Sequence, residues 1–322
     1  MLDMLKTPEK DLQLEIAQLE ARLGDLRSQL HVNYTTPLSS HLETKSPWTM
    51  SSELYKNNDS YNTFQSTALR ASPLHALLLL SDSALPLGSF AYSSGLESYL
   101  AHNKPLRTSP SAAFHRFLKL SIASIASTSL PYVLAGYRHP ETLETLDNDL
   151  DASTPCIVAQ RASVAQGRAL IGVWERAFRA SFAAPGPSTD AGARVAAGAI
   201  DDFADALKSN LEVEEEYDTV PKGHFAPLWG VVCRAMGLDL QQTAYIFVLN
   251  HAKAVLSAAV RASVMGPYQA QNILASQSLQ DTMMGRIKRE WDTQVEEAGQ
   301  VVPALDLWVG RHELLYSRIF NS

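Results

Sequence analysis

The chain has 322 residues, of which 46% are hydrophobic and 19% are charged, and its formal net charge is −7 at pH 7. That length is ample for a buried core in one large domain or two modest ones. The acidic balance excludes a protein that binds DNA or RNA non-specifically, because phosphate backbones attract a basic surface.

The first 72 residues are predicted to form two parts, a helix and a linker. Apolar residues recur at alternating steps of four and three over residues 1–32, at Leu12, Ile16, Leu19, Leu23, Leu26 and Leu30. Because this apolar stripe is short, it favours an amphipathic helix that docks on another surface rather than an independent coiled coil. Charged residues near Met1 interrupt the apolar run that a signal peptide needs, so secretion is not expected. Residues 33–72 are rich in Ser, Thr and Asn, which predicts a flexible linker.

From residue 73 to 322, apolar residues recur mostly at helical spacing, which predicts one all-α bundle of seven or more helices. The most apolar stretch, 244–264, contains His251, Lys253 and Arg261. A charge at membrane depth costs about 2.5–3.5 kcal/mol, so this stretch is predicted to be a buried core helix. Residues 183–220 predict a mobile insert, which begins with a low-complexity stretch and ends in the acidic run 212–218.

Local signatures of catalysis and of metal binding are missing from the sequence, so the chain is predicted not to be an enzyme. No lysine directly follows a glycine, which excludes a P-loop. The nine histidines show no zinc-like spacing, and His224 is expected to cap a helix or to lie in the core. The two cysteines are too few for a disulfide scaffold and favour a reducing compartment, and Cys233 is expected to be buried and inert.

One stretch, "LLLLSDSALPLGSFAYSSGLE" at residues 77–97, interrupts the helical pattern. It closely resembles the signature of the UreF family of urease accessory proteins, at Leu85, Pro86, Gly88, Phe90, Ser93, Gly95, Leu96 and Glu97. Three later blocks resemble the family in the same order: "RASVAQGRAL", "GHFAPLWGVVCRAMGL" and "PALDLWVGRHELLYSRIFNS". The N-terminal 70 residues, the loop 139–153 and the insert near 183–220 depart from compact bacterial members and look like those of eukaryotic, including fungal, members.

The resemblance implies an all-α, dimer-forming chaperone of the cytoplasm that is not itself an enzyme. Such a protein would join a UreD-type partner and a UreG-type GTPase, regulate GTP hydrolysis by that partner, and deliver nickel to apo-urease. It would bind no cofactor stably, because nickel would only pass through it, and neither nucleic acid nor a membrane is expected as a partner. Two rival functions remain open, a generic helical adaptor and, with less support, a hydrolase that uses Ser93 or Ser94.

The signature stretch predicts a sharp corner in the chain. Pro86 cannot continue a helix, and Gly88 allows a backbone angle that other residues resist. Phe90 is expected to fill a pocket under the corner, Ser93 to cap the next helix, and Glu97 to lie near the positive end of that helix. The residues expected to define the corner are Pro86, Gly88, Phe90, Ser93, Gly95 and Glu97, and those expected to be exposed for a partner are Asp82, Ser83 and Tyr92.

The C-terminal tail is predicted to be an interface. If residues 304–320 form one helix, Arg311 and Arg318 lie nearly one above the other, beside Trp308. Arginine next to aromatic residues is typical of interface hot spots. The alternative is that Arg311 pairs within the chain, with Glu313 or Asp306, or is simply solvated. The partner-binding residues predicted here are Arg311, His312, Glu313, Tyr316 and Arg318.

Overall fold

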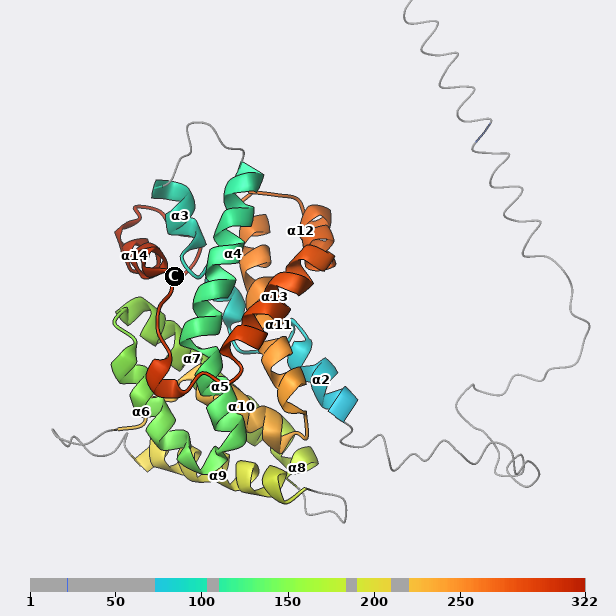
Figure 1. Cartoon of the computed structure of the whole chain (residues 1–322), viewed down its shortest axis with the longest axis vertical. Helices are drawn as coiled ribbons and strands as arrows, with labels where there is room; N and C mark the ends of the chain where they lie inside the picture. The colour runs from blue at the N-terminus through green and yellow to red at the C-terminus, as the bar shows by residue number, and fades with distance from the viewer. Residues whose placement is uncertain (1–21, 23–72, 103–109, 184–189, 210–219, 322) are drawn as a thin grey trace, which may run out of the picture. The chain divides into compact units, whose positions relative to one another are not determined.

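The computed structural model describes Arg22 and residues 73–102, 110–183, 190–209 and 220–321. Within these ranges the chain is helical and contains no strand (Figure 1), so the predicted all-α fold is confirmed. Apart from Arg22, the predicted N-terminal helix 1–32 lies outside the described residues, as do the linker 33–72 and the acidic run 212–218.

The described ranges contain α-helices in the following order along the chain. They are α2 (Pro73–Ser81), α3 (Leu96–His102), α4 (Pro110–Thr128), α5 (Leu130–Arg138), α6 (Leu143–Ser153), α7 (Ile157–Val173), α8 (Arg179–Phe182), α9 (Ala191–Ser209), α10 (Phe225–Ala235), α11 (Leu240–Arg261), α12 (Pro267–Leu274), α13 (Gln277–Glu290) and α14 (Pro303–Arg311). A π-helical turn, Trp174–Phe178, joins α7 to α8, and 3-10 turns occur at Ser89–Ala91, Pro140–Thr142, Val295–Glu297 and His312–Leu314.

Helix α10 is the most enclosed element of the bundle, and it packs against α5, α7 and α9. Its Leu228, Trp229 and Val232 have no exposed surface. Cys233 is also fully buried, and burial raises the pKa of its thiol well above the ordinary range, as expected of an inert cysteine. Gly230 lets α10 approach α5 closely, because a Cβ atom there would overlap the carbonyl oxygen of Val133.

Helix α11 confirms the predicted core helix. Asp239 caps its start, where the side chain accepts the Gln242 N–H and the Gln242 side chain accepts the Asp239 N–H. The helix packs against α4, α5, α12 and α13. By length and composition alone, Leu240–Arg261 and Ser111–Arg138 could cross a membrane, but 56% and 72% of their most apolar windows are buried inside the bundle. Such burial is the pattern of core helices in a globular domain.

The mobile insert predicted over 183–220 is wrong for residues 191–209, which form α9. Its buried side chains include Ala196, Ile200 and Phe203, and the helix packs on α10. The alanine-rich composition that suggested low complexity has a different physical meaning here. Alanine is the strongest helix former, and small side chains on one face let α9 lie close to its neighbour.

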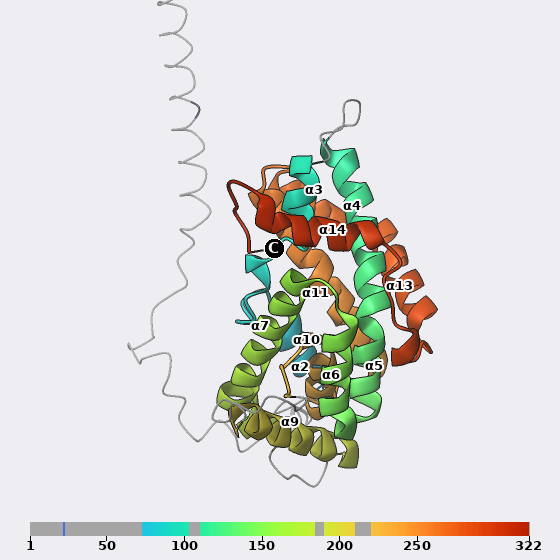
Figure 2. The same ribbon diagram turned by 90° about the vertical axis from the view of Figure 1, so that its left-hand side faces the viewer.

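Helix α14 lies across α3 and α4, at the end of the bundle away from α9 (Figures 1 and 2). The C-terminus therefore returns to the elements that follow the signature stretch.

We expect Gly230→Ala to lower the free energy of unfolding by about 2 kcal/mol or more, because the added methyl forces α10 away from α5. Gly198→Ala in α9 is the matched control. A Cβ atom at position 198 would meet nothing within 4 Å, so this change should raise stability by about 0.5–1 kcal/mol through helix propensity. Urea unfolding of both variants measures the two effects, and equal stabilities would contradict the close approach of α5 and α10.

Candidate functional site

The signature loop, residues 82–95, turns the chain in two places. Gly88 has φ of 70°, and a side chain there would meet nothing within 4 Å, so the requirement at this position is conformational. Ser94 and Gly95 then adopt φ of 51° and 85° immediately before α3. Left-handed backbone is unfavourable for serine, so this second turn is held in place by its surroundings.

The loop exposes some residues that were expected at its surface. Asp82 and Ser83 are exposed and Tyr92 is half-buried. Pro86 is also exposed, in the turn before Gly88. Phe90 was expected to fill a pocket beneath the corner, but 36% of its surface is exposed. The 3-10 turn Ser89–Ala91 instead places the Phe90 ring 5.9 Å from the guanidinium of Arg261 at the end of α11.

Glu97, in the first turn of α3, binds the C-terminal segment, which we define as residues 312–321. Its carboxylate accepts hydrogen bonds from His312 Nε2 at 2.9 Å, from the Ile319 N–H at 2.7 Å and from the Phe320 N–H at 3.2 Å. Ser93 supports this arrangement, because its Oγ accepts the Glu97 N–H at 3.3 Å. The second half of the signature is therefore an intramolecular docking site.

The single helix assumed for residues 304–320 is wrong, because α14 ends at Arg311 and a 3-10 turn follows. The physical reason is competition for backbone donors. Glu97 takes the N–H groups of Ile319 and Phe320, which a continuing helix would use for its own carbonyls. Arg311 and Arg318 consequently do not stack two turns apart on one helix face.

The predicted interface residues of the tail divide into two groups. His312 is fully buried, and its Nδ1 finds no hydrogen-bond partner among the described residues. Arg311, Tyr316 and Arg318 are exposed. Glu313 is also exposed, but it forms an ion pair with Arg161 of α7.

The intrachain pairing proposed as an alternative for Arg311 is not seen among the described residues. Glu313 is engaged by Arg161, and Asp306 accepts a hydrogen bond from Gln300 Nε2 at 2.9 Å. Both candidate carboxylates therefore have other partners.

A cavity of about 410 Å³ lies beside the signature loop. Its wall takes residues from the loop itself and from α2, α4, α6, α7, α10, α11 and α14, so no local sequence pattern could have indicated it. Hydroxyl groups are frequent in this wall, among them Ser121, Ser124, Thr128 and Ser163. The wall of the cavity thus combines a mainly apolar surface with several hydroxyl groups.

His251 and Lys253 of α11 place two nitrogen groups in the cavity wall. His251 Nε2 lies 2.7 Å from Ser121 Oγ, and burial lowers the pKa of this imidazole from 6.5 to about 4, so it is neutral at pH 7. The Lys253 ammonium donates to the Ser81 carbonyl. Burial lowers the pKa of Lys253, and the nearby Asp82 carboxylate opposes that shift.

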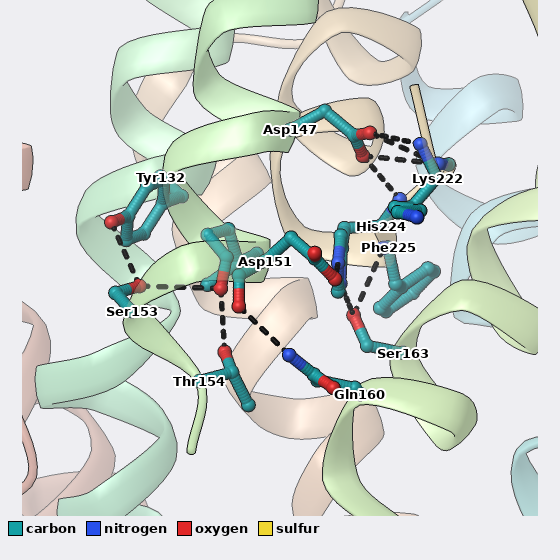
Figure 3. Close-up of polar contacts among 12 residues, drawn as sticks. Tyr132, Asp147, Asp151, Ser153, Thr154, Gln160, Ser163, Lys222, His224 and Phe225 are labelled. Carbon is teal, nitrogen blue, oxygen red and sulfur yellow. Dashed lines mark hydrogen bonds and ion pairs between the residues drawn. The ribbon is translucent and has the colours of Figure 1, made fainter. Parts of the chain in front are cut away.

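His224, which the sequence placed at a helix start or in the core, joins three helices (Figure 3). It is fully buried at the start of α10, with Nδ1 3.0 Å from Ser163 Oγ and Nε2 3.0 Å from Asp151 Oδ1. Asp147 of α6 fixes the preceding backbone by accepting the N–H groups of Lys222 and Gly223 at 2.6 and 3.1 Å. These bonds connect α6 and α7 to the entry of α10.

Asp151, His224 and Ser163 are linked by hydrogen bonds in the acid–histidine–serine order of a catalytic triad. Their surroundings nevertheless favour a structural role. Ser163 Oγ already accepts the Phe225 N–H at 3.2 Å, and His224 has no exposed surface for a substrate. In the part of the chain that the structure describes, no group of three or more His, Cys, Asp or Glu could hold a metal ion.

Known proteins resemble this chain over most of its length. The UreF family model matches residues 109–278. The uncharacterized urease accessory protein UreF-like of Schizosaccharomyces pombe is 38% identical over 248 residues, which cover 77% of this chain and 97% of that protein. Urease accessory protein F of Arabidopsis thaliana is 31% identical, covering 76% and 90% of the two chains, and UreF of Paenarthrobacter aurescens is 26% identical, covering 77% and 97%.

The shifted pKa of His251 predicts a loss of stability in acid. Because the folded-state pKa of about 4 lies below the ordinary 6.5, the unfolded chain binds more protons between these values. Stability is therefore full above about pH 6.5 and falls as the pH drops towards 4, by up to about 2 kcal/mol at pH 5. Urea unfolding at pH 7 and pH 5 should show a smaller pH difference in His251→Gln than in the unaltered protein. An equal pH difference in the two proteins would show that the lowered pKa of His251 is not the cause of the acid destabilisation.

We expect Glu97→Gln to free the C-terminal segment while the bundle stays folded, because an amide cannot accept three hydrogen bonds as the carboxylate does. Limited trypsin digestion should then cleave faster after Arg318, with helical circular dichroism unchanged. Glu144→Gln, at an exposed position of α6, is the matched control and should leave the digestion rate unaltered. Unchanged cleavage in Glu97→Gln would show that this carboxylate does not hold the segment.

Proposed function

Because the chain belongs to the UreF family of urease accessory proteins, we propose that it delivers nickel to apo-urease in a complex with a UreD-type protein and a UreG-type GTPase. It acts there as a chaperone and scaffold without catalysis of its own, and it regulates GTP hydrolysis by the UreG-type partner. The protein works as a homodimer in the cytoplasm.

The observation that carries this proposal is the chemistry of the C-terminal segment. Leu314, Tyr316 and Ile319 are large apolar side chains that remain exposed, with 77%, 106% and 62% of their surfaces accessible. Arg311 and Arg318 are exposed beside them. Exposed aromatic and aliphatic groups flanked by arginine fit a protein interface, where arginine supplies bidentate contacts to carboxylates. We assign this surface to the UreD-type partner.

The signature loop adds a second, polar part to the proposed interface. Asp82 and Ser83 are exposed on it and Tyr92 is half-buried. A short carboxylate and a hydroxyl on a rigid corner can bind a partner without a large loss of conformational entropy.

The cavity is the proposed route for nickel. Its hydroxyl groups and the neutral His251 are weak or single ligands, so a divalent cation would keep most of its water and move on. A site for storage would instead gather several His, Cys or carboxylate ligands around one point. The composition of the wall therefore supports passage of nickel without stable binding.

A generic helical adaptor is the remaining alternative, since an exposed apolar tail would also serve that role. Reconstitution separates the two functions. Apo-urease is incubated with nickel, GTP, the UreD-type protein and the UreG-type GTPase, with or without this protein, and its nickel content and activity are measured. Activation should require this protein, and equal activation in its absence would contradict the proposal.

We expect replacement of Arg311 and Arg318 together by alanine to weaken binding to the UreD-type partner about 10³-fold. Each anchor of this kind contributes about 2 kcal/mol, and about 1.4 kcal/mol corresponds to a factor of ten. Replacement of the exposed Lys288 and Arg289 of α13 is the control, because it removes the same charge elsewhere. Titration calorimetry measures the affinity for the UreD-type partner, and circular dichroism checks that each variant is folded. Retained binding by a folded double variant would exclude the tail as the interface.

A further inference from the structure

The cavity beside the signature loop has the size and the access of a small-molecule site. Its volume of about 410 Å³ lies within the range of about 300–1,000 Å³ that is usual for ligand sites. A cavity of about 150 Å³ already binds benzene, so this volume suffices for about two or three fused or linked rings. Asp82, Ser83 and Pro155 belong to the wall and are exposed, so solutes can enter from the surface of the bundle.

One side of the cavity is apolar. Phe225 of α10 and Ile125 of α4 line it and are only half-buried, although both pack against the core. The Phe225 ring is supported from behind, with its centroid 5.3 Å from that of Trp229 and 5.9 Å from that of Phe247. A flat apolar molecule would gain both burial and ring contacts against this rigid aromatic cluster.

Two polar atoms on the wall have no hydrogen-bond partner among the described residues. They are Ser124 Oγ of α4 and Nδ1 of His251, whose Nε2 lies 2.7 Å from Ser121 Oγ. Neither atom is sealed off, because His312 Nδ1 is the one enclosed side-chain nitrogen or oxygen without a partner in the described part of the chain. Ser124 follows Ser121 by one helical turn, so both atoms lie at the same end of the cavity. They are available to bond a ligand there.

The charges of the wall favour an uncharged ligand. His251 is neutral at pH 7, since burial lowers its pKa to about 4. Lys253 is a cation, but the Asp82 carboxylate lies close enough to oppose the lowering of the Lys253 pKa, so the two charges offset each other. A charged ligand group at the Ser124 end would have no counter-ion, which makes its burial unfavourable.

We propose that the cavity is a binding site for a small uncharged molecule with a flat apolar body and a carbonyl or hydroxyl group. The body lies against Phe225 and Ile125, and the polar group bonds to Ser124 Oγ and His251 Nδ1. The site itself does not depend on the proposed function. Only one consequence does, namely that a bound molecule would occupy the proposed route of nickel.

The test measures binding of prodan, an uncharged naphthalene that carries a propionyl carbonyl and a dimethylamino group. Equilibrium dialysis with the full chain, without nickel or partner proteins, gives its affinity and stoichiometry. Two comparison compounds separate the contributions to binding. Dimethylaminonaphthalene lacks the carbonyl, and anilinonaphthalene sulfonate adds a negative charge.

Two pairs of variants locate the bound molecule. Ala162→Phe fills the cavity from α7, and Ala165→Phe is its control, at an exposed position of the same helix outside the wall. Ser124→Ala removes the hydroxyl group that bonds the ligand. Ser127→Ala is its control, because Ser127 is buried on the same helix but does not line the cavity. Circular dichroism checks the folding of each variant, and the serine pair decides the matter if Ala162→Phe does not fold.

We expect one prodan molecule to bind per chain, and the sulfonate to bind about ten-fold more weakly or less. Ala162→Phe should weaken prodan binding about ten-fold or more, and Ala165→Phe should leave it unaltered. Ser124→Ala should weaken prodan binding about three-fold or more without affecting dimethylaminonaphthalene, and Ser127→Ala should affect neither compound.

Four results would each overturn the proposal. They are no saturable binding of prodan, equal prodan affinity in folded Ala162→Phe and Ala165→Phe, equal or tighter binding of the sulfonate, and the same change for both uncharged compounds in Ser124→Ala.

Discussion

One carboxylate joins the beginning and the end of the described bundle. Glu97 accepts a hydrogen bond from the imidazole of His312 and two more from the backbone of Ile319 and Phe320. Hydrogen bonds to a charged acceptor are stronger than neutral ones, and loss of that acceptor leaves buried donors without partners. The path of the chain after α14 depends on this contact, because all three donors belong to residues 312–321.

Helical periodicity was sufficient to predict the fold class and the core, because each long helix carries its apolar face in its own sequence. The stretch around residues 244–264 is the clearest case, and it became α11. Residues 191–209 show the limit of composition as a guide. Their alanines and glycines suggested a mobile segment, whereas burial against α10 makes the same small residues a packing surface.

The candidate site could be predicted only in pieces. The signature loop and the tail were each recognisable, but Glu97 and His312 are 215 positions apart, and no local pattern pairs them. The tail was misjudged because helix propensity ignores a distant acceptor that competes for backbone N–H groups. The cavity was missed for a related reason. Its wall takes a few side chains from each of several helices, and only their packing brings Ser121 and His251 together.

The signature posed a choice between a fold-defining corner and a partner contact, and its geometry points to a third role. Ser94 and Gly95 turn the backbone through left-handed angles, Leu96 is fully buried, and Glu97 then faces the C-terminal segment. Strain at Ser94 persists only where the surroundings maintain it, and here it aims a carboxylate at the chain's own terminus. A protein that recognised this part of the signature would therefore have to compete with the C-terminal segment for Glu97. Binding of such a protein to Glu97 would then require release of the C-terminal segment from the same carboxylate.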